Sequence, residues 1–445
     1  MNLLNFFKPA PHIDEIPDPG EVKQKYRYWR WRTFVGMYIG YIFYYFTRKS
    51  LIIAMPVMIQ DLGFTKVQLG ILGSVLYMSY GMSKFVSGVA ADRSNPRYFM
   101  GFGLILTGIC NIFFGFSSSL MLFTVFWGLN GWFQGWGWPP CARLLTHWYS
   151  QNERGSWWGT WNTSHNIGGL AIAFVGAMVA THFGWRAAML VPGILCVGVG
   201  IFLIACLRDT PQSLGLPPIE KFRNDETELA GADEKKDLSV KEILFEYVLK
   251  NRFIWILAIA YFFVYVVRTA VNDWTTVYLC EAKNYSILTA GSCVGMFEIG
   301  GIFGSLASGA MSDRIFKGRR GPVNVIFAAG VFGAFLLLWF FPGVHHMLHM
   351  GILFLMGFFV FGPQMLIGMH AAELSHKKAA GTATGFCGWF AYFGAAAACV
   401  PIGMIIDSYS WTGYLFVIGV CSISALLLLL PLWSATGKKS VAVEA

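Results

Sequence analysis

Apolar runs long enough to cross a lipid bilayer recur along almost the whole chain. They cover residues 32–58, 69–90, 98–116, 120–146, 156–180, 187–206, 253–280, 289–310, 322–341, 348–371, 379–406 and 412–435. A helix needs about 20 apolar residues to span hydrocarbon, where every backbone amide must find a partner within the chain. The runs are too continuously apolar for the alternating strands of a barrel. The sequence therefore predicts an all-α membrane protein with twelve transmembrane helices.

The charged residues support this topology. Only 13% of the chain is charged, whereas soluble domains carry about 25%. Of the 33 lysines and arginines, 26 fall at the N-terminus, in alternate loops, in a central polar segment or at the C-terminus. Three fall in the intervening loops, namely Lys66, Arg186 and Lys283. The remaining four lie within apolar runs, namely Arg48, Lys49, Lys84 and Arg268. Under the positive-inside rule, both termini lie in the cytoplasm. The net charge of +9 is thus a topology signal of a bacterial inner-membrane protein, and no nucleic-acid partner is expected.

Two similar halves are connected by the polar segment 207–252. Gly88-x-x-x-Asp92-Arg93 recurs as Gly309-x-x-x-Asp313-Arg314, an offset of 309 − 88 = 221, and Arg48 recurs as Arg268, an offset of 268 − 48 = 220. Parallel repeats of this kind enclose a central cavity near the bilayer midplane. We expect a six-helix bundle over 1–206, a cytoplasmic linker over 207–252, a second bundle over 253–445, and function as a monomer. Asp92, Arg93, Asp313 and Arg314 are then candidate residues of a cytoplasmic gate.

Arg48 and Arg268 indicate the class of ligand. An arginine at mid-span costs about 3 kcal/mol and needs a partner inside the bundle. Internal ion pairs are one explanation, but Asp273 and Glu298 are the only acids within the neighbouring spans. These two acids face a larger number of cations, so an anionic ligand is expected. Paired guanidinium groups suit the oxygens of a phosphoryl group better than they suit a single carboxylate.

Further donors fall within the same spans. Lys84 and His165 can add contacts to a phosphate, although a lone histidine in a helix is often only a packing residue, and His165 can titrate near neutral pH. Possible contacts to a sugar are Tyr41, Tyr45, Tyr80, Asn162, Tyr265 and Tyr392. The nine cysteines show no metal-binding or disulfide spacing, and the chain has no P-loop, catalytic triad or H-E-x-x-H motif. We therefore expect no cofactor, no metal and no enzymatic activity.

Longer motifs resemble a known family across nearly the whole chain. They include FFKPAPH near the start, YYFTRKS around Arg48, GMSKF around Lys84, WNTSHNIGG around His165, RDTPQSLGLPPIE in the linker and VYVVRTAVNDW around Arg268. With the two G-x-x-x-D-R loops, they resemble the organophosphate:phosphate antiporter family of the major facilitator superfamily, and within it the hexose-phosphate transporter and sensor branch.

This resemblance implies roles for individual residues. It implies that Arg48 and Arg268 bind phosphate, that His165 assists, and that Lys49, Asp273 and Glu298 exchange ion pairs as the protein changes conformation. The sequence departs from the dedicated hexose-phosphate transporters at Thr384 and Cys387, where they carry an aspartate and a lysine, and this puts the sugar-side contacts in doubt. The expected function is uptake of hexose phosphate, glucose 6-phosphate in particular, in exchange for inorganic phosphate. The alternatives are a hexose-phosphate sensor that signals to a histidine kinase and, more remotely, a membrane sugar phosphatase.

Overall fold

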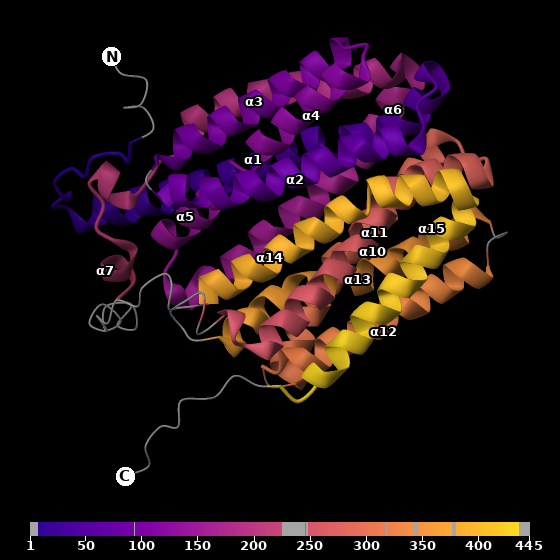
Figure 1. Cartoon of the computed structure of the whole chain (residues 1–445). Helices are drawn as coiled ribbons and strands as arrows, with labels where there is room; N and C mark the ends of the chain where they lie inside the picture. Colours follow the sequence, from indigo (N-terminus) through magenta and orange to yellow (C-terminus); the bar gives the residue numbers. More distant parts are fainter. Residues whose placement is uncertain are drawn as a thin grey trace. The chain divides into compact units, whose positions relative to one another are not determined.

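The computed structural model describes residues 8–92, 94–224, 245, 248–316, 318–341, 345–375 and 380–435, and this part of the chain is helical without any strand. The helices are α1 (Pro19–Leu62), α2 (Lys66–Asp92), α3 (Pro96–Phe116), α4 (Leu120–Gln134), α5 (Trp138–Trp148), α6 (Gln151–Cys206), α7 (Ile219–Arg223), α10 (Arg252–Lys283), α11 (Ile287–Ala310), α12 (Arg320–Phe340), α13 (His346–Leu374), α14 (Ala380–Ala397) and α15 (Val400–Leu429). Figure 1 shows these helices along the chain.

The twelve predicted spans all correspond to helix in the described residues. Helix α6 contains two of them, because Gly184 has a left-handed backbone (φ 78°) that separates its two parts. Helix α15 breaks in the same way at Ser410 (φ 59°), so its first part continues the span begun by α14. Eight helical segments are long and apolar enough to cross a membrane by composition, and two of these, Trp157–Cys206 and Thr382–Leu432, each contain two predicted spans. The remaining two spans are α2 and the pair α4 and α5.

The chain divides into two compact units. Unit 1 comprises Met1–Ala54 and Ser79–Lys236, and unit 2 comprises Met55–Met78 and Asp237–Ala445. The last two turns of α1, from Met55, and the first half of α2, to Met78, thus belong to unit 2, although they precede most of unit 1 in the sequence.

In unit 1, close helix packing is combined with an aromatic core. Helix α3 lies against the second part of α6, where a side chain at Gly101 or Gly108 would meet the carbonyl oxygens of Gly200 or Gly193. The two backbones therefore approach each other directly, as is common between membrane helices. Buried tryptophans and tyrosines fill the space around α1; they include Tyr26, Tyr41, Tyr44, Trp148, Tyr149 and Trp161.

The beginning of the polar linker packs onto unit 1. Asp209 is fully buried and accepts hydrogen bonds from Arg143 on α5, with Arg143 Nη2 at 3.0 Å from Asp209 Oδ1. Glu153 lies between Arg30 of α1 and Arg223 of α7, at 2.5 and 3.1 Å. Burial opposes the ionisation of Glu153, but the hydrogen bonds and charges of the two arginines outweigh it and lower the pKa of this carboxyl. The signature motif RDTPQSLGLPPIE therefore has a structural role here, because it anchors the linker to α5.

In unit 2, α11 and α13 pack backbone to backbone, while α12 lies beside α13 and α15 (Figure 1). A Cβ atom at Gly304 of α11 would overlap the carbonyl oxygen of Phe358 on α13, and one at Gly357 of α13 would overlap that of Phe297 on α11. Only glycine permits this approach, so the α11 and α13 contact depends on residues without side chains.

We expect Gly304→Ala to destabilise the protein by about 1–3 kcal/mol, the usual cost of overpacking a close contact. Eight of the nine free cysteines are buried, so unfolding in detergent can be followed with a dye that fluoresces on reacting with thiols. Gly333→Ala on α12 is the matched control, because a Cβ atom there would meet open space. Equal melting temperatures for the two variants would contradict the packing argument.

Candidate functional site

Arg48 of α1 lies between two aromatic rings of unit 1. Its guanidinium carbon is 4.7 Å from the ring centre of Tyr45 and 4.6 Å from that of Tyr80 on α2. Its Nε donates a hydrogen bond to Gln134 Oε1 on α4 at 3.1 Å. The rings and the amide orient the guanidinium while adding no negative charge.

The Gln134 amide is itself held in one orientation. Its Nε2 lies 3.0 Å from the carbonyl oxygen of Tyr44 and 2.9 Å from Thr47 Oγ1, and Asn130 Nδ2 donates to the carbonyl of Thr47 at 2.9 Å. A carbonyl oxygen can only accept a hydrogen bond, so the NH₂ group of Gln134 must face Tyr44 and its oxygen must face Arg48. The side chain is 1% exposed. The direction of the arginine is therefore set by a buried polar network.

His165 of α6 joins the same cluster. Its ring centre is 4.6 Å from that of Tyr41 and 5.5 Å from that of Tyr45, the residue stacked on Arg48. Nδ1 lies 2.6 Å from the backbone carbonyl oxygen of Asn162. A carbonyl oxygen can only accept a hydrogen bond, so Nδ1 carries a proton and donates it to Asn162. Unit 1 thus brings together five of the candidate site residues, namely Arg48, His165, Tyr41, Tyr45 and Tyr80.

The two lysines of unit 1 also lie against aromatic rings. Lys84 Nζ is 4.8 Å from the ring centre of Trp138 at the start of α5, and Lys49 Nζ is 5.5 Å from that of Tyr45. Lys49 is 6% exposed. Tyr45 therefore contacts both Arg48 and Lys49, which are adjacent in the sequence.

Arg268 of α10 has a similar setting in unit 2. Its guanidinium carbon is 5.4 Å from the ring centre of Tyr265 and 5.2 Å from that of Phe361 on α13. Tyr265 in turn packs against Tyr261 and Tyr392, with ring centres 4.9 and 5.9 Å away. Tyr261 donates to the backbone carbonyl of Gln364 at 2.6 Å. Unit 2 thus brings together three of the residues expected from the sequence, namely Arg268, Tyr265 and Tyr392.

The expected acids of unit 2 are buried. Asp273 is 5% exposed and accepts hydrogen bonds from Tyr77 at 2.8 Å and from Asn272 at 2.6 Å. Glu298 of α11 is 1% exposed. Their exchange of ion pairs with Lys49 stays a prediction.

The candidate gate residues are only partly described. Asp313 lies in the turn Met311–Ile315 and pairs with Arg320, which also binds Glu373 at 3.0 Å. These contacts join the ends of α11, α12 and α13. Arg314 is exposed. The Asp92 side chain and Arg93 lie outside the described residues.

The two positions that depart from the family pattern make helix contacts. Thr384 donates to the carbonyl of Gly368 at 3.1 Å, and the buried Cys387 thiol lies 3.8 Å from the carbonyl of Ile254. Neither side chain carries a charge that could bind a ligand.

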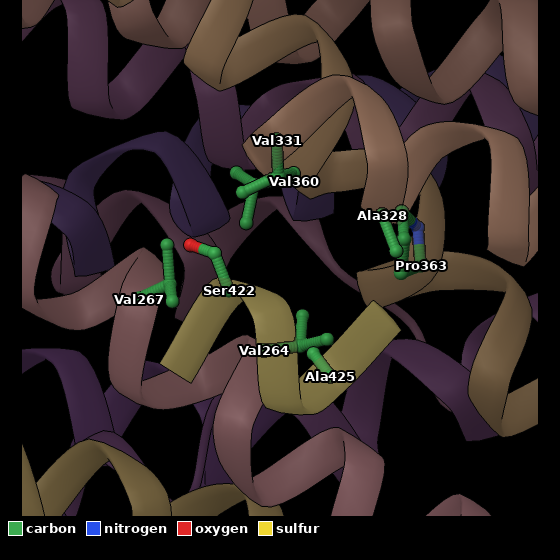
Figure 2. A pocket seen from close by; sticks show the side chains of 8 residues that line it. All are labelled: Val264, Val267, Ala328, Val331, Val360, Pro363, Ser422 and Ala425. Carbon is green, nitrogen blue, oxygen red and sulfur yellow. The ribbon is translucent and has the colours of Figure 1, made fainter. Parts of the chain in front are cut away.

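A small gap in unit 2 is a poor candidate for an anion site. It lies where α10, α12, α13 and α15 meet, next to Pro363, and Figure 2 shows its side chains. Seven of the eight lining residues are apolar, and the eighth, Ser422, donates to the carbonyl of Ile418 in its own helix. Among the described residues, no group of three or more His, Cys, Asp or Glu side chains is arranged to hold a metal ion.

The repeat around each arginine also includes two tyrosines, a match that Sequence analysis does not include. Tyr41-x3-Tyr45-x2-Arg48 recurs as Tyr261-x3-Tyr265-x2-Arg268 at the same offset of 220. The burial classes of residues 41–50 also recur one by one over residues 261–270. Tyr261 could have been found from this spacing alone. Gln134 could not, because a glutamine in an apolar run gives no sign of which side chain it contacts.

The fold and the two arginine clusters define a membrane transporter of the two-bundle type rather than an enzyme. The Major Facilitator Superfamily model matches residues 37–399. The chain is 58% identical over 451 residues to a "Probable hexose phosphate transport protein" of Chlamydia pneumoniae, covering 99% of each. It is 49% identical over 433 residues to the "Membrane sensor protein UhpC" of Escherichia coli strain K12, covering 97% of this chain and 99% of the relative.

A solved structure shows the same fold. The crystal structure of a bacterial homolog of the human lysosomal transporter Spinster, inward-facing and unoccupied, matches with a TM-score of 0.71 at 13% identity, over 91% of this chain and 95% of the other. The chain belongs to the major facilitator superfamily, in its organophosphate:phosphate antiporter branch.

Proposed function

We propose that this protein is a secondary transporter that takes up hexose phosphate, glucose 6-phosphate in particular, in exchange for inorganic phosphate. Its relatives named as hexose phosphate transport proteins support the substrate class. The chemistry that hexose phosphate and inorganic phosphate share supports antiport, because each presents a phosphoryl group that the same arginines can bind. No nucleotide is required, so the solute gradients supply the energy.

The proposal rests mainly on an arrangement that Arg48 and Arg268 share, in which each guanidinium contacts two aromatic rings. Each guanidinium lies over two aromatic rings in its own unit, an arrangement that restricts its rotamers before a ligand arrives. A preorganised guanidinium loses little entropy on binding, and two N–H groups on one edge match two phosphoryl oxygens. We propose that each of the two guanidinium groups binds phosphoryl oxygens in this way. Binding would then favour the conformational switch between the two access states.

His165 and Lys84 are proposed to complete the phosphate site from unit 1. With Nδ1 donating to Asn162, a proton added at Nε2 would create a donor for a dianionic phosphate. Tyr41, Tyr45, Tyr80, Asn162, Tyr265 and Tyr392 stay candidates for the sugar. The exchange of ion pairs by Lys49, Asp273 and Glu298, and a cytoplasmic gate at Asp92, Arg93, Asp313 and Arg314, remain part of the proposal.

Uptake into proteoliposomes tests the proposed function. We expect liposomes loaded with inorganic phosphate to accumulate labelled glucose 6-phosphate, and liposomes loaded with sulfate to accumulate much less. Internal phosphate should leave the vesicles as the sugar phosphate enters. Uptake that is independent of internal phosphate would contradict exchange and leave uniport or proton coupling.

A second candidate function is sensing of external hexose phosphate, with the signal passed to a histidine kinase. The 49% identity to a protein named as a membrane sensor favours it. A sensor would bind glucose 6-phosphate in calorimetry but would show no uptake in the same proteoliposomes. This pair of measurements separates the two functions.

A further inference from the structure

Three arginines of unit 1 meet at the end of α6. Arg32 of α1, Arg97 of α3 and Arg208, just beyond α6, all donate to the last carbonyls of that helix, at residues 204–207. Arg208 Nη1 lies 2.7 Å from one of these oxygens, and Arg32 Nε lies 3.3 Å from another. The C-terminal end of a helix carries partial negative charge, which attracts cations. One helix end, however, balances only about half of one charge.

Within the part of the chain that the structure describes, no acid balances the rest of this charge. Among the described residues, no carboxylate forms a salt bridge with Arg32, Arg97 or Arg208. Burial, followed by the positive charges of Arg97 and Arg32, lowers the pKa of Arg208. Each of the three side chains is only half-buried. A surplus of positive charge therefore faces outward at this end of the bundle.

Aromatic rings surround the three arginines. The Trp29 ring centre lies 5.2 Å from the guanidinium carbon of Arg32 and 4.7 Å from that of Arg208. Arg97 lies over Tyr98 at 5.1 Å. Tryptophan and tyrosine concentrate where lipid headgroups meet hydrocarbon. The arginines therefore lie at the headgroup level, close to the predicted starts of two spans and the end of a third.

Exposed apolar side chains lie about one helical turn deeper. Val35 of α1 is 43% exposed, and Ile201 and Phe202 of α6 are 59% and 41% exposed. A free phosphate ion would gain nothing from these groups. The acyl chains of a phospholipid would lie against them while its phosphate lies beside the arginines.

We propose that Arg32, Arg97 and Arg208 form a binding site for the phosphate of an anionic phospholipid in the cytoplasmic leaflet. The arginines supply charge-assisted hydrogen bonds to the phosphate oxygens, and the exposed face of α1 and α6 supplies the contact with the acyl chains. The site lies at one end of unit 1, apart from the Arg48 cluster, and it does not depend on the proposed transport function.

Native mass spectrometry of the purified full-length protein tests this site. Phosphatidylglycerol should bind more tightly than zwitterionic phosphatidylcholine. The double variant Arg32→Gln/Arg208→Gln should bind phosphatidylglycerol at least about tenfold more weakly, because each basic residue near an anionic lipid surface raises the affinity by about fivefold. Glutamine can still donate to the α6 carbonyls, which limits damage to the fold. Arg186→Gln, at an exposed arginine at the start of the second part of α6, is the control. It removes the same charge as Arg32→Gln alone.

Two results would overturn the proposal. One is equal affinity for phosphatidylglycerol in the double variant and in Arg186→Gln. The other is displacement of the lipid by millimolar inorganic phosphate, which would indicate a site for free anions without acyl-chain contacts. If the double variant does not fold, Arg32→Gln alone should still weaken binding severalfold, and an unchanged affinity in that variant would count equally against the site.

Discussion

Lysine in place of Arg48 should lower the uptake of glucose 6-phosphate by about a hundredfold, and we expect an effect of the same order for lysine in place of Arg268. Lysine keeps the positive charge but loses the planar fork that holds two phosphoryl oxygens at once. A hydrogen bond to a charged group contributes about 1.5–3 kcal/mol, so the loss of one or two of them accounts for this factor. Lysine also cannot use Gln134 and the rings of Tyr45 and Tyr80 as the guanidinium does.

The measurement is initial uptake into phosphate-loaded proteoliposomes, with the amount of reconstituted protein determined for each variant. Arg186→Lys is the matched control, since Arg186 is exposed and lies over Trp185 away from the Arg48 cluster. We expect that control to transport normally. Normal transport by both Arg48→Lys and Arg268→Lys would refute the role of the arginines, even if the unmodified protein exchanges sugar phosphate.

Much of the fold is predictable from the sequence because the bilayer imposes a simple rule on it. Any run of about 20 apolar residues must be helical in hydrocarbon, and all twelve runs are helical in the described residues. The gap between the fifth and sixth predicted spans, at 181–186, contains the break at Gly184, and the gap between the last two contains the break at Ser410. The docking of Asp209 onto Arg143 was not predictable, because a polar segment rich in proline reads as a linker unless its partner is known.

Charge and sequence repetition made the two arginines of the candidate site predictable. Arg48 and Arg268 stand out because a charge inside a span is costly, and the repeat relates one to the other. The groups that orient them do not stand out. The sequence indicates Tyr80 only as a possible sugar contact, whereas in the structure it lies against Arg48. Phe361 contacts Arg268 from another helix, and an aromatic residue in an apolar run looks like any other packing residue. Which ring meets which cation depends on tertiary structure.

Among the groups that orient the arginines, Gln134 is the one whose replacement we expect to have the largest effect. Replacement by glutamate keeps the size of the side chain but changes its contacts with Tyr44 and with Arg48. A carboxylate cannot donate to the Tyr44 carbonyl 3.0 Å away, and its charge would pair with the guanidinium of Arg48 at the oxygen that now accepts from Nε. An ion pair there would offset the positive charge that attracts the phosphate. Gln134→Glu should therefore weaken phosphate binding by at least about tenfold, which corresponds to about 1.4 kcal/mol.

The control is Asn130→Asp, which also introduces a buried carboxylate on α4, but at a side chain that donates to the Thr47 carbonyl at 2.9 Å and has no bond to Arg48. Both variants bear the cost of a buried acid, so a loss of stability alone would affect them equally. Calorimetry with inorganic phosphate on folded, monodisperse protein should show the larger loss of affinity for Gln134→Glu. In transport, its KM for glucose 6-phosphate should rise more than its kcat falls, because a ground-state binding interaction is lost. Equal phosphate affinities in the two variants would mean that Gln134 supports the helices without positioning the arginine.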